Sequence, residues 1–124
     1  MSQMGHEVPI WNCQDKFGDT SLLVDSIERG RDLAAILGSR PTALMRGHGA
    51  VIVGIDVRAA VYIAYYLEVA AKLQMQAMAM GEITFLTTGE IDLILAESGP
   101  FSTNRTWENW CRRAGRTMSC QQGK

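Results

Sequence analysis

The sequence has little of what marks a specialised class of protein. Its 124 residues include only 3 cysteines, 3 prolines and 2 histidines. The cysteines are odd in number and none has C-x-x-C spacing, so neither a disulfide framework nor a zinc knuckle is indicated. Twelve Lys and Arg against thirteen Asp and Glu leave a net charge of -1, which attracts neither nucleic acid nor an anionic membrane. We therefore expect no nucleic-acid partner and no membrane partner.

Long apolar runs are also lacking. The longest uncharged one, residues 59–67, is under half of the roughly 20 residues that a membrane-spanning helix needs. Residues 1–9 have neither the basic start nor the apolar run of a signal peptide. Together with the unpaired cysteines, these absences predict a soluble protein of the cytoplasm.

What the chain does have is ordinary globular composition, with 47% hydrophobic and 20% charged residues. Its length suits one domain. We expect that domain to cover residues 1–115 and a flexible tail to cover residues 116–124.

The order of elements indicates a mixed α/β fold. Residues 8–11 read as a strand that Pro9 confines to an edge or a strand start. A helix capped by Asp19 or Thr20 should end at Gly30, and a second short helix should cover residues 32–37.

Two short apolar runs, 42–45 and 50–53, are joined by Arg46-Gly47-His48-Gly49 and predict a β-hairpin. A histidine in such a turn is commonly just a surface residue. The flanking glycines, however, would let a substrate or an ion approach the imidazole closely. For Arg46 we favour an exposed strand-end residue without a function.

After the hairpin we expect three helices. Asp56 should cap a long helix over residues 57–80. Its narrow polar stripe predicts burial on several sides, against a sheet and another subunit. A capping box at 87–90 predicts a helix to residue 97, and a last helix should cover residues 104–114.

Two segments resemble a known family. L-M-R-G-H-G-A-V-I-V-G at 44–54 and A-x-Y-L-E-x-x-A-K-L-Q-x-Q-A at 64–77 are similar to the second half of a class II aldolase/adducin-type domain. Weaker pieces, V-P-I-W and F-G-D near the start and W-x-x-W near the end, extend the resemblance over about residues 8–114. Residues 1–115 thus look like the C-terminal portion of such a domain.

The resemblance implies a three-layer α/β/α class II aldolase-like fold, incomplete here, with a largely antiparallel sheet. It implies a homo-oligomer, with a tetramer favoured, and a carbon–carbon lyase acting on a small carbonyl or carboxylate substrate. A divalent metal, commonly zinc, is held in this family by three histidines. The last of them matches His48, which would bind the metal through a ring nitrogen. Gly47 resembles the R-G-H-G form of the decarboxylase-like branch.

In the family the other metal-binding histidines and the acid/base residue precede the matching segment. The metal site in this chain is therefore expected to be incomplete, the catalytic residues stay unassigned, and the chain alone should be inactive. His6 is a poor substitute ligand because it lacks a second histidine two residues away. The alternative is a non-catalytic, adducin-like oligomerisation module. Tyrosines and tryptophans on the helices, and Glu68 beside Lys72, are expected to serve packing and surface pairing.

Overall fold

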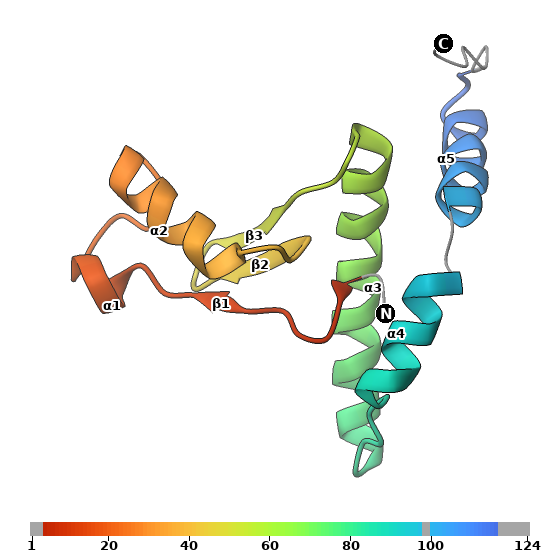
Figure 1. Ribbon diagram of the computed structural model, residues 1–124, viewed down its shortest axis with the longest axis horizontal. Helices are drawn as coiled ribbons and strands as arrows, with labels where there is room; N and C mark the ends of the chain where they lie inside the picture. The colour runs from red at the N-terminus through yellow and green to blue at the C-terminus, as the bar shows by residue number, and fades with distance from the viewer. Residues whose placement is uncertain (1–3, 98–99, 117–124) are drawn as a thin grey trace.

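The computed structural model describes residues 4–97 and 100–116 of the chain. These form a small sheet with two helices at one end and three further helices at the other (Figure 1). In chain order the elements are β1 (Ile10–Trp11), α1 (Gln14–Phe17), α2 (Ile27–Leu37), β2 (Thr42–Met45), β3 (Gly49–Ile52), α3 (Val57–Met80), α4 (Thr88–Glu97) and α5 (Pro100–Arg113). The mixed α/β class predicted from the sequence is confirmed.

The three strands form a mixed sheet in the order β1-β2-β3. β2 and β3 form the predicted antiparallel hairpin, in which Met45 pairs with Gly49. β1 lies at the edge, as Pro9 indicated, but runs parallel to β2, with Ile10 opposite Leu44. The prediction of a largely antiparallel sheet is therefore wrong. Parallel neighbours require a long crossover connection, and here α1 and α2 provide it.

The prediction of a helix that is capped by Asp19 or Thr20 and ends at Gly30 is also wrong. The structure has one helix, α2, in place of the two that we expected, and Gly30 lies inside it. Ser26 caps this helix, since its hydroxyl accepts a hydrogen bond from the Arg29 N–H at 3.2 Å. A serine cap satisfies the first turn, and the intrinsic cost of one glycine, about 1 kcal/mol, does not end a helix.

A small core holds the sheet end together. Trp11, Cys13 and Leu33 are buried, and Phe17 and Met45 are among the partly buried side chains packed against them. These residues come from β1, α1 with its preceding residue, α2 and β2, so the core joins the sheet to both crossover helices. Burial of their apolar surface is the main source of stability at this end.

A charged anchor closes the edge of this core. The Trp11 Nε1–H donates to Asp32 Oδ2 at 2.8 Å, and Lys16 Nζ lies 3.0 Å from Asp32 Oδ1. The hydrogen bond from Trp11, followed by that from Lys16, lowers the pKa of Asp32 below its usual 3.8. The anchor therefore links β1, α1 and α2 through one carboxylate.

Helix α3 begins and ends where the sequence predicted. Asp56 Oδ1 accepts the Ala59 N–H at 2.7 Å, which caps the helix. Just before it, a Cβ on Gly54 would lie 2.6 Å from the Ala60 nitrogen, so only glycine lets the chain pass this close to the first turn.

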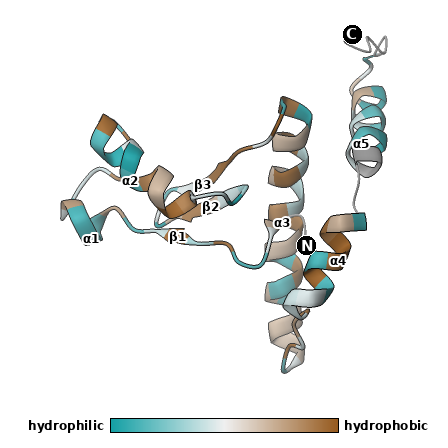
Figure 2. Ribbon diagram, in the orientation of Figure 1, coloured by the Kyte–Doolittle hydropathy of each residue, from teal (hydrophilic) through white to brown (hydrophobic). Residues whose placement is uncertain are grey.

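Among the described residues of α3, Tyr62 and Ala70 are buried, so the sheet covers less of this helix than predicted. The predicted burial against another subunit stays a prediction. Apolar stretches of α3 and α4 stand away from the sheet (Figure 2). Within residues 4–97 and 100–116, no helix combines the length and the apolar character that a membrane crossing requires.

The last two helices, α4 and α5, follow α3 in the chain. The capping box before α4 is confirmed, since Thr87 Oγ1 accepts the Glu90 N–H at 3.2 Å and Glu90 Oε2 accepts the Thr87 N–H at 2.8 Å. α5 begins at Pro100, earlier than predicted, because proline suits a first helical turn. It packs on α3 through Tyr65 and Trp110, whose ring centroids are 5.0 Å apart. Most of the predicted tail, 117–124, lies outside the described residues.

Candidate functional site

The histidine turn, residues 46–49, lies at the end of the β2–β3 hairpin. The His48 N–H donates to the Met45 carbonyl at 3.0 Å and closes the turn. Gly47 has a φ of +69°, which an L side chain rarely adopts. The sequence therefore places His48 on a short hydrogen-bonded turn, as predicted, rather than in a loose loop.

The His48 side chain is exposed. Its imidazole makes no hydrogen bond or ion pair with any residue in 4–97 or 100–116. The ring is thus neither buried in the core nor tied down within its own hairpin. An imidazole in this position keeps both ring nitrogens available to an external group.

Arg46 has a structural role that the sequence did not reveal. Its Nε donates to Asn12 Oδ1 at 2.7 Å, and its second guanidinium nitrogen donates to Gln14 Oε1 at 2.8 Å. Its backbone N–H also bonds to the Trp11 carbonyl at 3.0 Å. The guanidinium is engaged in these contacts, so it clasps the histidine turn to the start of α1. No local pattern could have indicated this, because the partners lie more than thirty residues away along the chain.

The described residues do not fit a divalent metal on their own. No group of three or more His, Cys, Asp or Glu in residues 4–97 and 100–116 is arranged to hold a metal ion. The other histidine, His6, is paired with Asp92 of α4, its Nε2 lying 2.9 Å from Asp92 Oδ1. Within this part of the chain His48 therefore does not have the two further protein ligands that a catalytic zinc usually has.

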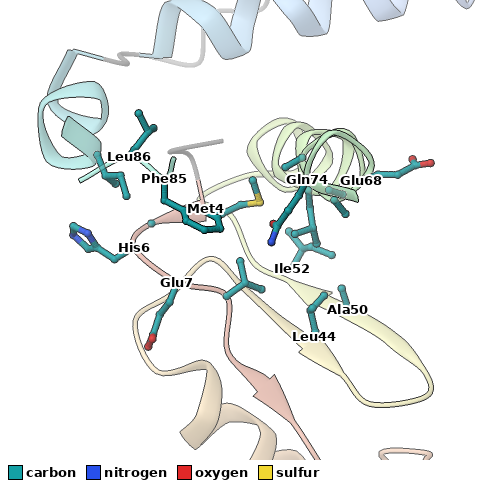
Figure 3. A pocket seen from close by; sticks show the side chains of 17 residues that line it. Met4, His6, Glu7, Leu44, Ala50, Ile52, Glu68, Gln74, Phe85 and Leu86 are labelled. Atoms are coloured by element: carbon teal, nitrogen blue, oxygen red, sulfur yellow. The ribbon is translucent and has the colours of Figure 1, made fainter. Parts of the chain in front are cut away.

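A cavity of about 820 Å³ lies between the hairpin and α3 (Figure 3). Side chains of β2, β3 and α3 line it, and residues 4–8 together with Phe85, Leu86 and Ile91 line its other side. In Figure 3 the labelled Met4, Leu44 and Ile52 lie around an apolar interior, and the Gln74 amide points inward. His48 does not line this cavity.

The charged groups at this cavity are already paired. Besides the His6–Asp92 pair, Glu7 bonds to Arg40, and Glu68 lies 2.5 Å from Lys72. The hydrogen bond from Lys72 lowers the pKa of Glu68. In Figure 3 the Glu68 carboxylate and the His6 ring point away from the interior. The cavity thus provides apolar volume and one amide, without a free acid/base pair among the described lining residues.

Comparison with known families identifies the kind of domain. Residues 1–75 match the sequence model of the class II aldolase and adducin N-terminal domain. The match includes the whole sheet, the histidine turn and most of α3. The chain belongs to this family. No curated protein matches the chain.

Class II aldolases are generally metal-dependent, and the family match agrees with a mixed α/β fold that is compatible with an incomplete aldolase-like domain. The resemblance expected between residue 75 and residue 114 lies beyond the match, so the family position of α4 and α5 stays a prediction. The roles of His48 as a ligand and of zinc as the metal likewise stay predictions.

Proposed function

We propose that this class II aldolase-family chain is part of a carbon–carbon lyase of the decarboxylase-like branch, and that His48 is one ligand of its divalent metal, zinc. The substrate is a small carbonyl or carboxylate compound. The other ligands come from polypeptide outside residues 4–97 and 100–116, so the chain is inactive alone. The remaining layers of a three-layer α/β/α fold would come from the same source.

The observation that carries this proposal is the free imidazole of His48 on a turn clasped by Arg46. A ligand must be accessible and must point in a reproducible direction to bind a metal tightly. His48 meets the first condition through its exposure, and the turn meets the second through its hydrogen bonds. The R-G-H-G form of the turn supports the decarboxylase-like branch.

Metal content tests this proposal. We expect the purified chain to hold much less than one zinc per protomer by plasma mass spectrometry. Adding a separate polypeptide that carries the upstream half of a class II aldolase domain should restore zinc binding. His48→Ala should abolish the restored zinc, because it removes a ligand. His6→Ala is the matched control and should leave it unchanged. Equal zinc in the wild-type and His48→Ala assemblies would remove the ligand role.

A second candidate, a non-catalytic oligomerisation module, is favoured by α4. This helix contains four aliphatic residues at 91 and 93–95, yet it has no buried residue, and Leu93 is 65% exposed. An exposed apolar patch of this kind marks an interaction surface. As a module of this type, the chain would assemble without binding metal.

Sedimentation velocity tests the assembly. We expect the full chain to self-associate, and Leu93→Lys to lower the average mass because a charge replaces apolar contact area. Glu97→Lys adds positive charge to the same helix without removing an apolar side chain, and should leave the mass unchanged. A compact monomer would count against assembly. Assembly without any His48-dependent zinc, even beside the upstream polypeptide, would favour the module over the lyase.

A further inference from the structure

Leu22 is strained in a way that points to the histidine turn. Among the described residues it is the one non-glycine residue with a positive φ, at 63°. A branched side chain is costly in this region of backbone conformation, so surrounding contacts must compensate for it. One such contact is the hydrogen bond that the Leu22 N–H donates to Thr20 Oγ1 at 3.1 Å.

The Leu22 side chain reaches the histidine turn itself. A Cβ placed on Gly47 would lie 3.1 Å from Leu22 Cδ1. Apart from Gly47 and its two chain neighbours, no other heavy atom of residues 4–97 and 100–116 lies within 4 Å of that point. Leu22 therefore covers the one side of Gly47 that an L side chain would occupy. Gly47 and Leu22 both hold left-handed backbone conformations, and they face each other beside His48.

This contact connects to the core. The Thr20 hydroxyl, which accepts the hydrogen bond from the Leu22 N–H, also donates a hydrogen bond to the sulfur of Cys13 at 3.6 Å. Cys13 is 2% exposed and belongs to the buried cluster of the sheet end. The strained loop is thus attached to the buried core of the sheet end.

A second set of contacts from the same segment fixes Arg46, the residue of the turn that precedes Gly47. Asn12 and Gln14, on either side of Cys13, accept both hydrogen bonds from the Arg46 guanidinium. Asn12 Oδ1 also accepts the Gln14 N–H at 3.2 Å, which fixes its own orientation. Arg46 and Gly47, the two residues before His48, are therefore both held from residues 12–22.

We propose that residues 12–22 form a brace for the histidine turn, and that Leu22 and Arg46 are positioning residues for His48. The brace limits the turn to one conformation and so fixes the direction of the imidazole. Its consequence for metal binding rests on the proposed function, whereas its effect on the turn does not. Strain of this kind persists where the surrounding structure over-determines a functional segment.

Amide hydrogen exchange on the full chain tests the brace directly. The His48 N–H closes the turn, and the Val53 N–H, bonded to the Pro41 carbonyl at 2.8 Å, reports on the far end of the hairpin. We expect Leu22→Ala to accelerate exchange at His48 by about tenfold and to leave Val53 within about twofold, because the opening is local. Leu23→Ala, in the same loop at a side chain 53% exposed, is the matched control and should change neither amide.

Two further variants protect this test against a folding defect. Arg46→Gln removes the guanidinium contacts to Asn12 and Gln14 at an exposed position. This variant should also accelerate exchange at the His48 amide and leave the Val53 amide unchanged. Leu22→Met keeps the side-chain reach and should restore slow exchange. Unchanged exchange at His48 in both Leu22→Ala and Arg46→Gln would overturn the brace, as would equal acceleration at His48 and Val53.

Zinc binding by the assembly described above tests the positioning role. Leu22→Ala should weaken zinc affinity by about tenfold, the loss typical of a residue that orients a ligand, whereas Leu22→Met should recover it. Faster exchange at His48 with unchanged zinc affinity would overturn the positioning role. Failure of the wild-type assembly to bind zinc through His48 would instead overturn the proposed function, and the exchange result would still decide the brace.

Discussion

The sheet end and the helical arm of this chain are stabilised in different ways. At the sheet end, residues 4–53, side chains from distant parts of the sequence meet in a core and in directional hydrogen bonds, as at Trp11 and Asp32. In the arm, residues 54–97 and 100–116, most polar contacts are local caps and one surface pair. Large apolar side chains are exposed in both regions, but more of them lie in the arm. The difference predicts that the sheet end is the more stable of the two regions in the isolated chain.

Trp11→Ala, at the sheet end, should cause the largest loss of stability. This change opens the core and leaves Asp32 without its closest donor, so we expect a loss of about 3–5 kcal/mol in the free energy of unfolding. Urea denaturation followed by circular dichroism measures it. Trp110→Ala in the arm is the matched change and should cost less, because the Trp110 ring is partly exposed. Equal losses would mean that the two regions do not differ as described.

A smaller effect should appear in the acid stability of the sheet end. The pKa of Asp32 is lowered in the folded state, chiefly by the hydrogen bond from Trp11. Its contribution to stability is therefore present above the unfolded pKa and is lost as pH falls through the lower folded value. Urea midpoints measured from pH 5 downward should decline less steeply below about pH 3.8 in Asp32→Asn than in the wild type.

Trp11→Phe, which keeps the ring but removes the indole N–H, should reproduce part of that change. A wild-type acid profile identical to those of both variants would contradict the anchoring role of Asp32. The variants thus separate the directional part of the sheet end from its apolar part.

The smallest effect is expected in the arm, from Glu68→Gln on α3. Both partners of the Glu68–Lys72 pair are about two-thirds exposed, and a solvated ion pair contributes little to stability. We expect no measurable change in the urea midpoint at neutral pH and moderate salt. A clear loss would show that this part of α3 is covered by another surface under those conditions.

Local signals predicted most of the arm and part of the sheet end. The Asp56 cap, the capping box at residues 87–90 and the glycines of the hairpin turn each act within a few residues, so their outcome is readable along the chain. The hairpin and the exposed position of His48 followed from the same reasoning.

The failures arise where distant residues decide the structure. Gly30 was expected to break a helix, but the Ser26 cap and the packing of Leu33 into the core keep α2 continuous. The parallel pairing of β1 with β2 depends on a crossover whose direction is settled only when α2 packs on the sheet.

The sequence alone thus determined the helix caps, the hairpin turn and the membership in a family, because these depend on residue types at short spacing. The tertiary structure decided that the sheet is mixed, that Arg46 is engaged by Asn12 and Gln14, and that strained Leu22 rests on Gly47. Those contacts join residues some twenty to thirty-five positions apart. They exist only after apolar burial has brought β1, the following loop and the hairpin together, which no local pattern encodes.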